Sequence, residues 1–213
     1  MYCHLCTFKT LTLPTPEAAE ETRNFIKKAG GDSTWDRLAE YLTKESSDKD
    51  IFVINRTFNA PIEIMFDMWT NPKHFTEWMG PAGSTMQFFR SDIKKGGSTF
   101  YMMTGKGDFK LYGRAEYLEI EKPNRIVYTQ QFCDENEKIT RHPMASTWPE
   151  TMLTVVTLAE EEPDKTRVTV AWEAYGLATQ EETEAFVKER GGMTQGWTGS
   201  FDKLEDYLSS ISA

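Results

Sequence analysis

The sequence predicts an α+β fold in which a curved antiparallel sheet of about six to seven strands wraps around a long C-terminal helix. Two observations carry this prediction. Strand-like segments follow one another over residues 85–175, and the last segment repeats apolar residues at helical spacing. Consecutive strands with short connections pair antiparallel, and an amphipathic helix buries its apolar stripe against a sheet. We therefore expect one sheet, one long covering helix and two short helices after the first strand.

The first strand and the two short helices fall within residues 51–78. The segment IFVINRTF at 51–58 is mostly apolar, which is typical of a strand. Pro61 follows closely and suits the first turn of a helix, where its missing N–H is not needed. Pro72 interrupts this helix, and residues 73–78 then form a second short one.

The sheet is completed by six segments of alternating or continuous apolar character. Glycine, proline and charged residues separate most of them and indicate turns. Residues 142–150 contain two prolines and are expected to form a long loop instead. The predicted strands are residues 85–91, 98–104, 110–121, 125–133, 151–159 and 166–175.

The C-terminal helix is predicted from residue 179 onward, with some irregularity. Met193, Trp197, Phe201, Leu204 and Leu208 recur at steps of four, four, three and four, which makes one apolar helical stripe.

Four glycines interrupt this helix: Gly191, Gly192, Gly196 and Gly199. Each glycine inside a helix costs roughly 0.5–1 kcal/mol relative to alanine. Their accumulation indicates that the helix faces empty space, or that another backbone approaches it closely.

Residues 1–46 are predicted to be an appendage to the main domain at 50–211. A strand is expected around residues 2–13 and a helical piece at 35–42, with a polar linker at 44–50. The pattern at 20–42 resembles that at 181–208, which suggests a partial internal duplication; chance similarity of two amphipathic helices is the alternative. Such a piece cannot bury its apolar face alone. It should pack on the main domain or on a second chain, which leaves a homodimer open.

Composition excludes several classes of function. The chain of 213 residues has a formal net charge of −9, so it lacks the basic surface of a nucleic-acid-binding protein. No apolar run approaches the roughly 20 residues of a membrane-spanning helix, and no signal-peptide core is found. Three cysteines give no disulfide framework. We therefore expect a cytoplasmic protein with neither nucleic-acid nor membrane partners.

Few residues indicate catalysis or metal binding. Cys3 and Cys6 have the spacing of zinc and redox sites, but a metal site needs about four ligands, so two ordinary cysteines are the preferred interpretation. His74 is interpreted as a surface residue and His142 as a loop residue, because neither has an evident catalytic partner. The sequence therefore predicts no metal, no cofactor and no enzymatic activity.

Aromatic residues make up 13% of the chain and suggest a core or a cavity lined with rings. A dry, close-packed core and a ligand cavity are equally compatible with them. Arg114 could bind a ligand carboxylate from within a strand or could face water. The candidate ligand-binding residues are Trp78, Met79, Phe88, Tyr101, Met103, Tyr112, Arg114, Phe132, Met152, Trp172, Met193 and Trp197.

Six segments in order over about residues 51–210 resemble START-like helix-grip proteins (the SRPBCC superfamily), in the branch similar to the C-terminal domain of the activator of heat-shock protein 90 ATPase. They are FNAPIEIMFDMWTNPKHFTEWMGPAG, the turn Lys95-Gly96-Gly97, GRAEYLEIEKPNRIVYT, RHPMASTWPETMLTVVTL, KTRVTVAWEAYGLATQEE and GGMTQGWTGSFDKLEDYL.

The resemblance implies a helix-grip fold and two functions. Members are mostly described as binders of small or lipid-like molecules, or as chaperone-linked stress-response proteins. We expect non-catalytic binding of a hydrophobic or aromatic small molecule between sheet and helix. The alternative is an interaction protein with a heat-shock protein 90 chaperone as partner. An enzyme of cyclase or hydrolase type is the third hypothesis, and no set of catalytic residues in the sequence supports it.

Overall fold

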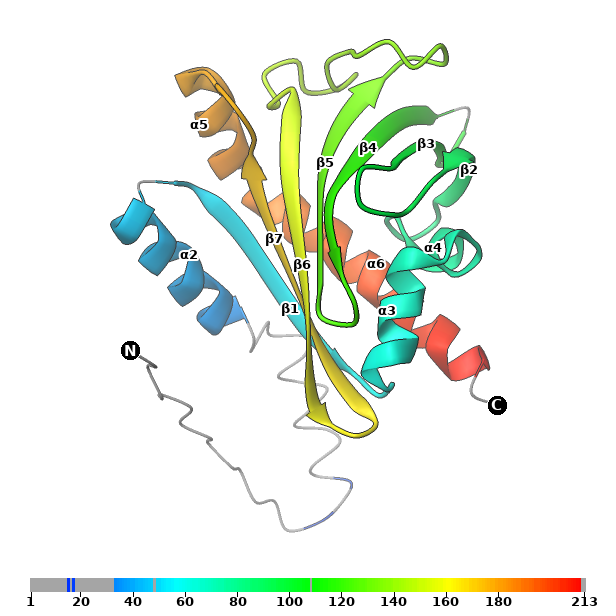
Figure 1. Ribbon diagram of the computed structural model, residues 1–213. Helices are drawn as coiled ribbons and strands as arrows, with labels where there is room; N and C mark the ends of the chain where they lie inside the picture. Colours follow the sequence, from blue (N-terminus) through cyan, green and yellow to red (C-terminus); the bar gives the residue numbers. More distant parts are fainter. Residues whose placement is uncertain (1–14, 16, 18–32, 48, 108, 212–213) are drawn as a thin grey trace.

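The computed structural model describes residues 15, 17, 33–47, 49–107 and 109–211 (Figure 1). The strand expected around residues 2–13, the segment 20–32 and the two cysteines near the start lie outside this range.

A seven-stranded antiparallel sheet forms the centre of the molecule, in the order β1-β7-β6-β5-β4-β3-β2 (Figure 1). This architecture confirms the predicted α+β fold class. Each strand from β2 to β7 pairs with its neighbour in sequence, and β1 pairs with β7 and forms one edge of the sheet. The strands are β1 Ile51–Phe58, β2 Thr85–Ser91, β3 Ser98–Thr104, β4 Lys110–Glu121, β5 Arg125–Cys133, β6 Thr151–Glu162 and β7 Lys165–Ala174.

The predicted strand boundaries hold except in the β6–β7 hairpin. There β6 continues to Glu162 and β7 begins at Lys165, so the connection is shorter than expected. The acidic residues at the end of β6 predict a turn. In the structure they remain paired with β7, with a register shift between Glu160 and Glu162. The ladder hydrogen bonds therefore outweigh the low strand propensity of glutamate.

Two short helices follow β1, as predicted: α3 Ile62–Thr70 and α4 Pro72–Trp78. Pro61 is the N-cap of α3. Between the helices, the Asn71 side chain accepts a hydrogen bond from Lys73 N at 3.1 Å and caps α4. These helices lie beside β2 and α6 at one end of the sheet (Figure 1).

The C-terminal segment forms two helices, α5 Gln180–Lys188 and α6 Arg190–Ile211. A capping box between Thr179 and Glu182 starts α5. The long helix α6 crosses beneath the sheet (Figure 1). Its stripe is buried, with Phe201 and Leu204 both fully covered.

The N-terminal helix α2 spans Ser33–Ser47 and corrects the predicted linker at 44–50. The polar residues after Lys44 continue the helix, because the hydroxyls of Ser46 and Ser47 donate to the Thr43 carbonyl at 3.2 and 2.8 Å. Polar composition alone therefore misplaced the helix end. Only the few residues before Ile51 connect α2 to β1.

Helix α2 packs on the main domain, along the outer edge of β1 (Figure 1). Val53 N donates to Glu40 Oε1 at 2.7 Å, and the Asn55 side chain donates to Asp36. Glu40 also accepts two hydrogen bonds from the first residue of α6: Arg190 Nη2 at 2.8 Å and Arg190 Nε at 3.0 Å. One carboxylate thus joins α2, β1 and α6. Over the part of the chain that the structure covers, no helix is long and apolar enough to cross a membrane.

Candidate ligand cavity

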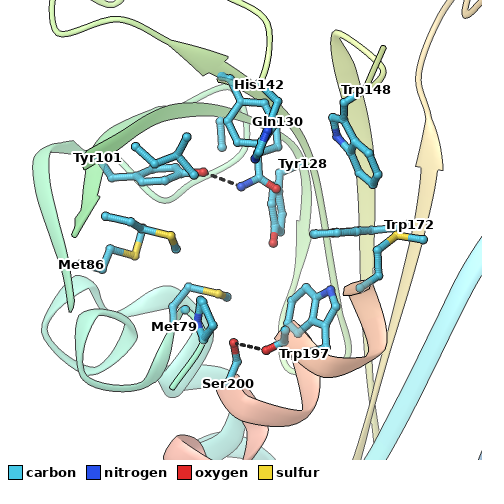
Figure 2. A pocket seen from close by; sticks show the side chains of 18 of the residues that line it. Met79, Met86, Tyr101, Tyr128, Gln130, His142, Trp148, Trp172, Trp197 and Ser200 are labelled. Carbon is cyan, nitrogen blue, oxygen red and sulfur yellow. Dashed lines mark hydrogen bonds between the residues drawn. The ribbon is translucent and has the colours of Figure 1, made fainter. Parts of the chain in front are cut away.

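A cavity of about 490 Å³ lies between the concave face of the sheet and α6. Strands β2 to β5 and β7 form its wall, the α4–β2 connection closes one side, and the loop between β5 and β6 covers another (Figure 2). The wall is mainly aromatic rings and methionine side chains.

Eight of the twelve predicted site residues line this cavity. They come from five elements and one connection that are distant in sequence, and the curvature of the sheet brings them together. They are Met79, Phe88, Tyr101, Met103, Phe132, Trp172, Met193 and Trp197.

Two predicted residues, Trp78 and Met152, belong to the hydrophobic core and not to the cavity wall. Trp78 is fully buried; its Nε1 donates to the Met68 carbonyl at 3.0 Å, and its ring centroid lies 4.7 Å from that of Trp69. Met152 is 4% exposed. Neighbouring side chains cover both, so the close-packed interpretation holds for them.

The other two, Tyr112 and Arg114, lie on the opposite face of β4. The Tyr112 ring stacks on Phe100, with centroids 6.2 Å apart and planes at 25°. The Arg114 guanidinium forms ion pairs with Glu116 and, at 3.9 Å, with Glu137. Strand alternation gives the reason, because residues two apart share a face. Arg114 is therefore not available to a carboxylate in the cavity.

Several further residues line the cavity that sequence reasoning missed, and six of them add large or polar side chains to its wall. Met86 shares a strand face with Phe88, and Tyr128 and Gln130 share one with Phe132, so period-two alternation could have found these three. His142 and Trp148 lie in the long loop, where no periodicity applies. These six residues are Met86, Tyr128, Gln130, His142, Trp148 and Ser200.

The glycines of α6 have two different roles. Gly192, Gly196 and Ser200 follow one another at steps of four, which places them in one row, and all three line the cavity. A Cβ added to Gly196 would meet nothing within 4 Å. At Gly199 an added Cβ would lie 3.2 Å from Ala82 N, so this glycine allows a close backbone approach. The sequence left empty space and close backbone approach as alternatives for this helix, and the structure has the first at Gly196 and the second at Gly199.

The long loop over the cavity is anchored from outside. Arg141 Nη1 donates to the Trp148 carbonyl at 3.1 Å and to the carboxylate of Glu182 on α5. The Thr179 N–H, the side chain of Arg141 and its charge hold the pKa of Glu182 below its usual range, with burial opposing them. Arg141 thereby ties the loop to α5.

His142, in the same loop, packs edge-on against Phe132 with ring centroids 4.7 Å apart. Its Nδ1 accepts from Met144 N at 3.2 Å. Burial lowers the pKa of His142, so the neutral ring is favoured.

The polar groups inside the cavity are uncharged. Gln130 Nε2 donates to the Tyr101 hydroxyl (Figure 2). Burial raises the pKa of Tyr101 to about 12 and also raises the pKa of Tyr128. The indole N–H groups of Trp172 and Trp197 are buried and have no hydrogen-bond partner among the described residues.

Metal and acid–base groups do not gather at this cavity. Over the described residues, no three His, Cys, Asp or Glu side chains cluster in a way that could hold a metal ion. A histidine–carboxylate pair does exist elsewhere: His74 Nε2 lies 3.2 Å from Asp67, and His74 Nδ1 lies 2.7 Å from the Tyr207 hydroxyl. It joins α3, α4 and α6 outside the cavity wall.

Solved structures of similar fold come from several bacteria. A protein from Arthrobacter aurescens has 22% identity and a TM-score of 0.64, covering 75% of this chain and 86% of that chain. A Mycobacterium smegmatis protein has 21% identity and a TM-score of 0.62, covering 76% and 91%. A Staphylococcus epidermidis protein has 26% identity and a TM-score of 0.60, covering 76% and 92%. No curated protein matches the chain.

A protein family matches most of the main domain. The family described as activator of Hsp90 ATPase homolog 1-like protein matches residues 59–209, from the residue after β1 almost to the end of α6. The match and the structural neighbours agree with the START-like resemblance of the sequence segments. The chain therefore belongs to the family of activator of Hsp90 ATPase homolog 1-like proteins.

Proposed function

We propose that the protein binds a hydrophobic or aromatic, lipid-like small molecule in the cavity between the sheet and α6, without catalysing a reaction on it. The observation that carries this proposal is the cavity itself, which has a volume of about 490 Å³ and a wall of aromatic rings and thioethers. Small-molecule sites typically have volumes of roughly 300–1,000 Å³ and an apolar wall with a few polar groups.

The methionines of the wall support a ligand that is not closely matched in shape. Met79, Met86, Met103 and Met193 line the cavity. Methionine side chains are flexible and polarisable, so they adapt to different hydrophobic surfaces. The rings of Trp172 and Trp197, with centroids 5.4 Å apart, offer flat apolar surface beside them.

The titratable groups at the cavity support binding without catalysis. Among the described residues, the wall holds one histidine, His142, and one carboxylate, Glu189. Glu189 is exposed at the rim, and Nδ1 of His142 is engaged by a backbone N–H. A general base needs a positioned partner and a substrate proton within reach, and the pair of His74 and Asp67 lies outside this wall.

The test is a titration of the purified chain with uncharged hydrophobic probes, naphthalene, pyrene and dodecanol, followed by tryptophan fluorescence and by thermal unfolding. We expect saturable quenching by the aromatic probes and a rise in Tm with probe concentration, because a ligand that binds only the folded state stabilises it. If none of the probes changes fluorescence or Tm, the proposal is wrong.

Two glycine variants of α6 test whether the probes bind in the cavity. Gly196→Leu puts a side chain into the cavity, where an added Cβ meets nothing within 4 Å. Gly191→Leu makes the same chemical change at an exposed position of α6 that is not part of the wall. We expect probe binding to be lost in the first variant and kept in the second. Equal binding by both variants would place the ligand elsewhere.

Regulation of a heat-shock protein 90 chaperone is the second candidate, and the family description is the observation that favours it. The test is direct: the chain is added to purified heat-shock protein 90, and complex formation and ATPase rate are measured. Stimulation of the ATPase by wild type and by Gly196→Leu alike would support a chaperone role that does not depend on the cavity.

A further inference from the structure

One wall of the cavity carries an uncharged polar pair, Tyr101 on β3 and Gln130 on β5 (Figure 2). Gln130 Nε2 donates to the Tyr101 hydroxyl. Neither side chain has another hydrogen bond to the part of the chain that the structure describes. The phenol hydrogen and the amide carbonyl oxygen therefore remain available. Turning the amide over reverses the roles, so in either orientation the pair offers at least one donor and one acceptor.

The position of Tyr101 is fixed by its neighbours. Gly113 lies directly opposite it on β4, and a Cβ at this glycine would overlap the tyrosine ring. The Phe88 ring meets it edge-on, with centroids 6.3 Å apart and planes at 86°. The ring is 5% exposed. Its hydroxyl is thus held in place before any ligand enters, which reduces the ordering cost of binding.

The surroundings of the pair favour an uncharged ligand. No lysine or arginine lines the cavity among the described residues, and the carboxylate of Glu189 lies exposed at the rim. An ionised carboxylate or phosphate would lose its hydration here without gaining a counterion. The unpartnered indole N–H groups of Trp172 and Trp197 add donors to the wall and no charge.

We infer that Tyr101 and Gln130 recognise a hydroxyl group on an otherwise apolar, uncharged ligand, an inference that rests on the function proposed above. A hydroxyl group can accept from Tyr101 and donate to Gln130 at the same time. A hydrocarbon of the same size would leave both groups without a partner once it displaced water. The pair therefore selects alcohols and phenols from hydrophobic compounds of similar shape.

Four probes with one ring system test this inference on the full chain: naphthalene, 2-methoxynaphthalene, 2-naphthol and 2-naphthoate. We expect 2-naphthol to bind roughly tenfold more tightly than naphthalene, which corresponds to about one net hydrogen bond. The methyl ether accepts but does not donate, so its affinity should lie between them. The ionised 2-naphthoate should bind weakest.

Two variants assign the preference to the pair. Tyr101→Phe and Gln130→Met should bring 2-naphthol and naphthalene to similar affinity. Tyr112→Phe on β4 and Gln131→Met on β5 are the controls on the opposite face of the sheet and should keep the wild-type preference. Thermal unfolding of each variant verifies that it is folded.

The outcomes separate the two proposals. If naphthalene and 2-naphthol bind wild type equally, the hydroxyl inference is overturned and the binding function stands. Tightest binding by 2-naphthoate would overturn the inference as well, because it requires a cationic site. If no probe binds, the proposed function fails and the inference fails with it.

Discussion

The two halves of α6 share one helix and one spacing of apolar residues, but they face the sheet differently. The first half presents Gly192, Gly196 and Ser200 to the sheet and lines a cavity. The second half presents Phe201 and Leu204, which are fully buried in close-packed surroundings. The cavity thus lies opposite the half of the helix that carries the smallest side chains.

This difference teaches that the cavity depends on side-chain volume as well as on the course of the backbone. A helix with alanine or leucine in the glycine row would keep the same path, with more of the space filled. The helical cost of glycine is roughly 0.5–1 kcal/mol per residue. Such a cost is consistent with a role for the open space in function.

The largest effect is expected in the second half, where Phe201→Ala should destabilise the fold by about 3–5 kcal/mol. Phe201 is fully buried and meets Phe58 edge-on, with centroids 5.5 Å apart. Urea unfolding measures the loss. A loss below about 1 kcal/mol would show that the second half is loosely packed and would remove the contrast between the halves.

The start of α6 is also attached to α2 through Glu40. Glu40→Gln should therefore lower the free energy of unfolding by roughly 1.5–3 kcal/mol, the usual contribution of hydrogen bonds to a charged group. Glu40 accepts from Val53 N and from two nitrogens of Arg190. Glu45→Gln, at an exposed position of the same helix, is the control. Equal stability of the two variants would show that the link between α2 and α6 contributes little.

Alanine substitutions inside α6 should separate its two kinds of glycine. Gly196→Ala should raise stability by about 0.5–1 kcal/mol, because an added Cβ meets open space. Gly199→Ala should gain less or lose stability, because its Cβ would lie 3.2 Å from Ala82 N. Thermal and urea unfolding compare the stability of both variants with that of wild type. The opposite order would contradict the assignment of their roles.

The smallest expected effect is on the pH dependence of stability, through His142, which lines the same cavity as the first half of α6. Burial lowers the pKa of His142 below its unfolded value of about 6.5. The folded state then binds fewer protons than the unfolded state, so the contribution to stability is complete above about pH 6.5 and is lost as the pH falls through the folded pKa. Stability should decline on acidification less in His142→Phe than in wild type. Identical pH profiles of the two proteins would contradict this role.

Much of the fold follows from periodicity in the sequence. The six strands after the short helices and the stripe from Met193 to Leu208 were predicted, because period-two and period-3.6 patterns report burial directly. The end of α2 was not, since polar residues such as Ser46 and Ser47 fit a helix end and a linker equally well in composition.

The cavity was only partly predictable. Alternation identifies which residues share the concave face, but it does not tell a covered side chain such as Met152 from one at an open space such as Tyr101. That distinction depends on what the opposing helix carries at the same level. The loop residues His142 and Trp148 have no periodic pattern, so their place at the cavity depends on contacts such as the hydrogen bond from Arg141.

The position of α2 along β1 has a consequence for association with other chains. β1 is an edge strand, and an uncovered edge offers free N–H and C=O groups on which a foreign strand can add. Glu40 occupies the Val53 N–H, and Asp36 holds the neighbouring Asn55. A domain shortened to residues 50–211 would expose this edge, so we expect it to self-associate at concentrations at which the full chain does not.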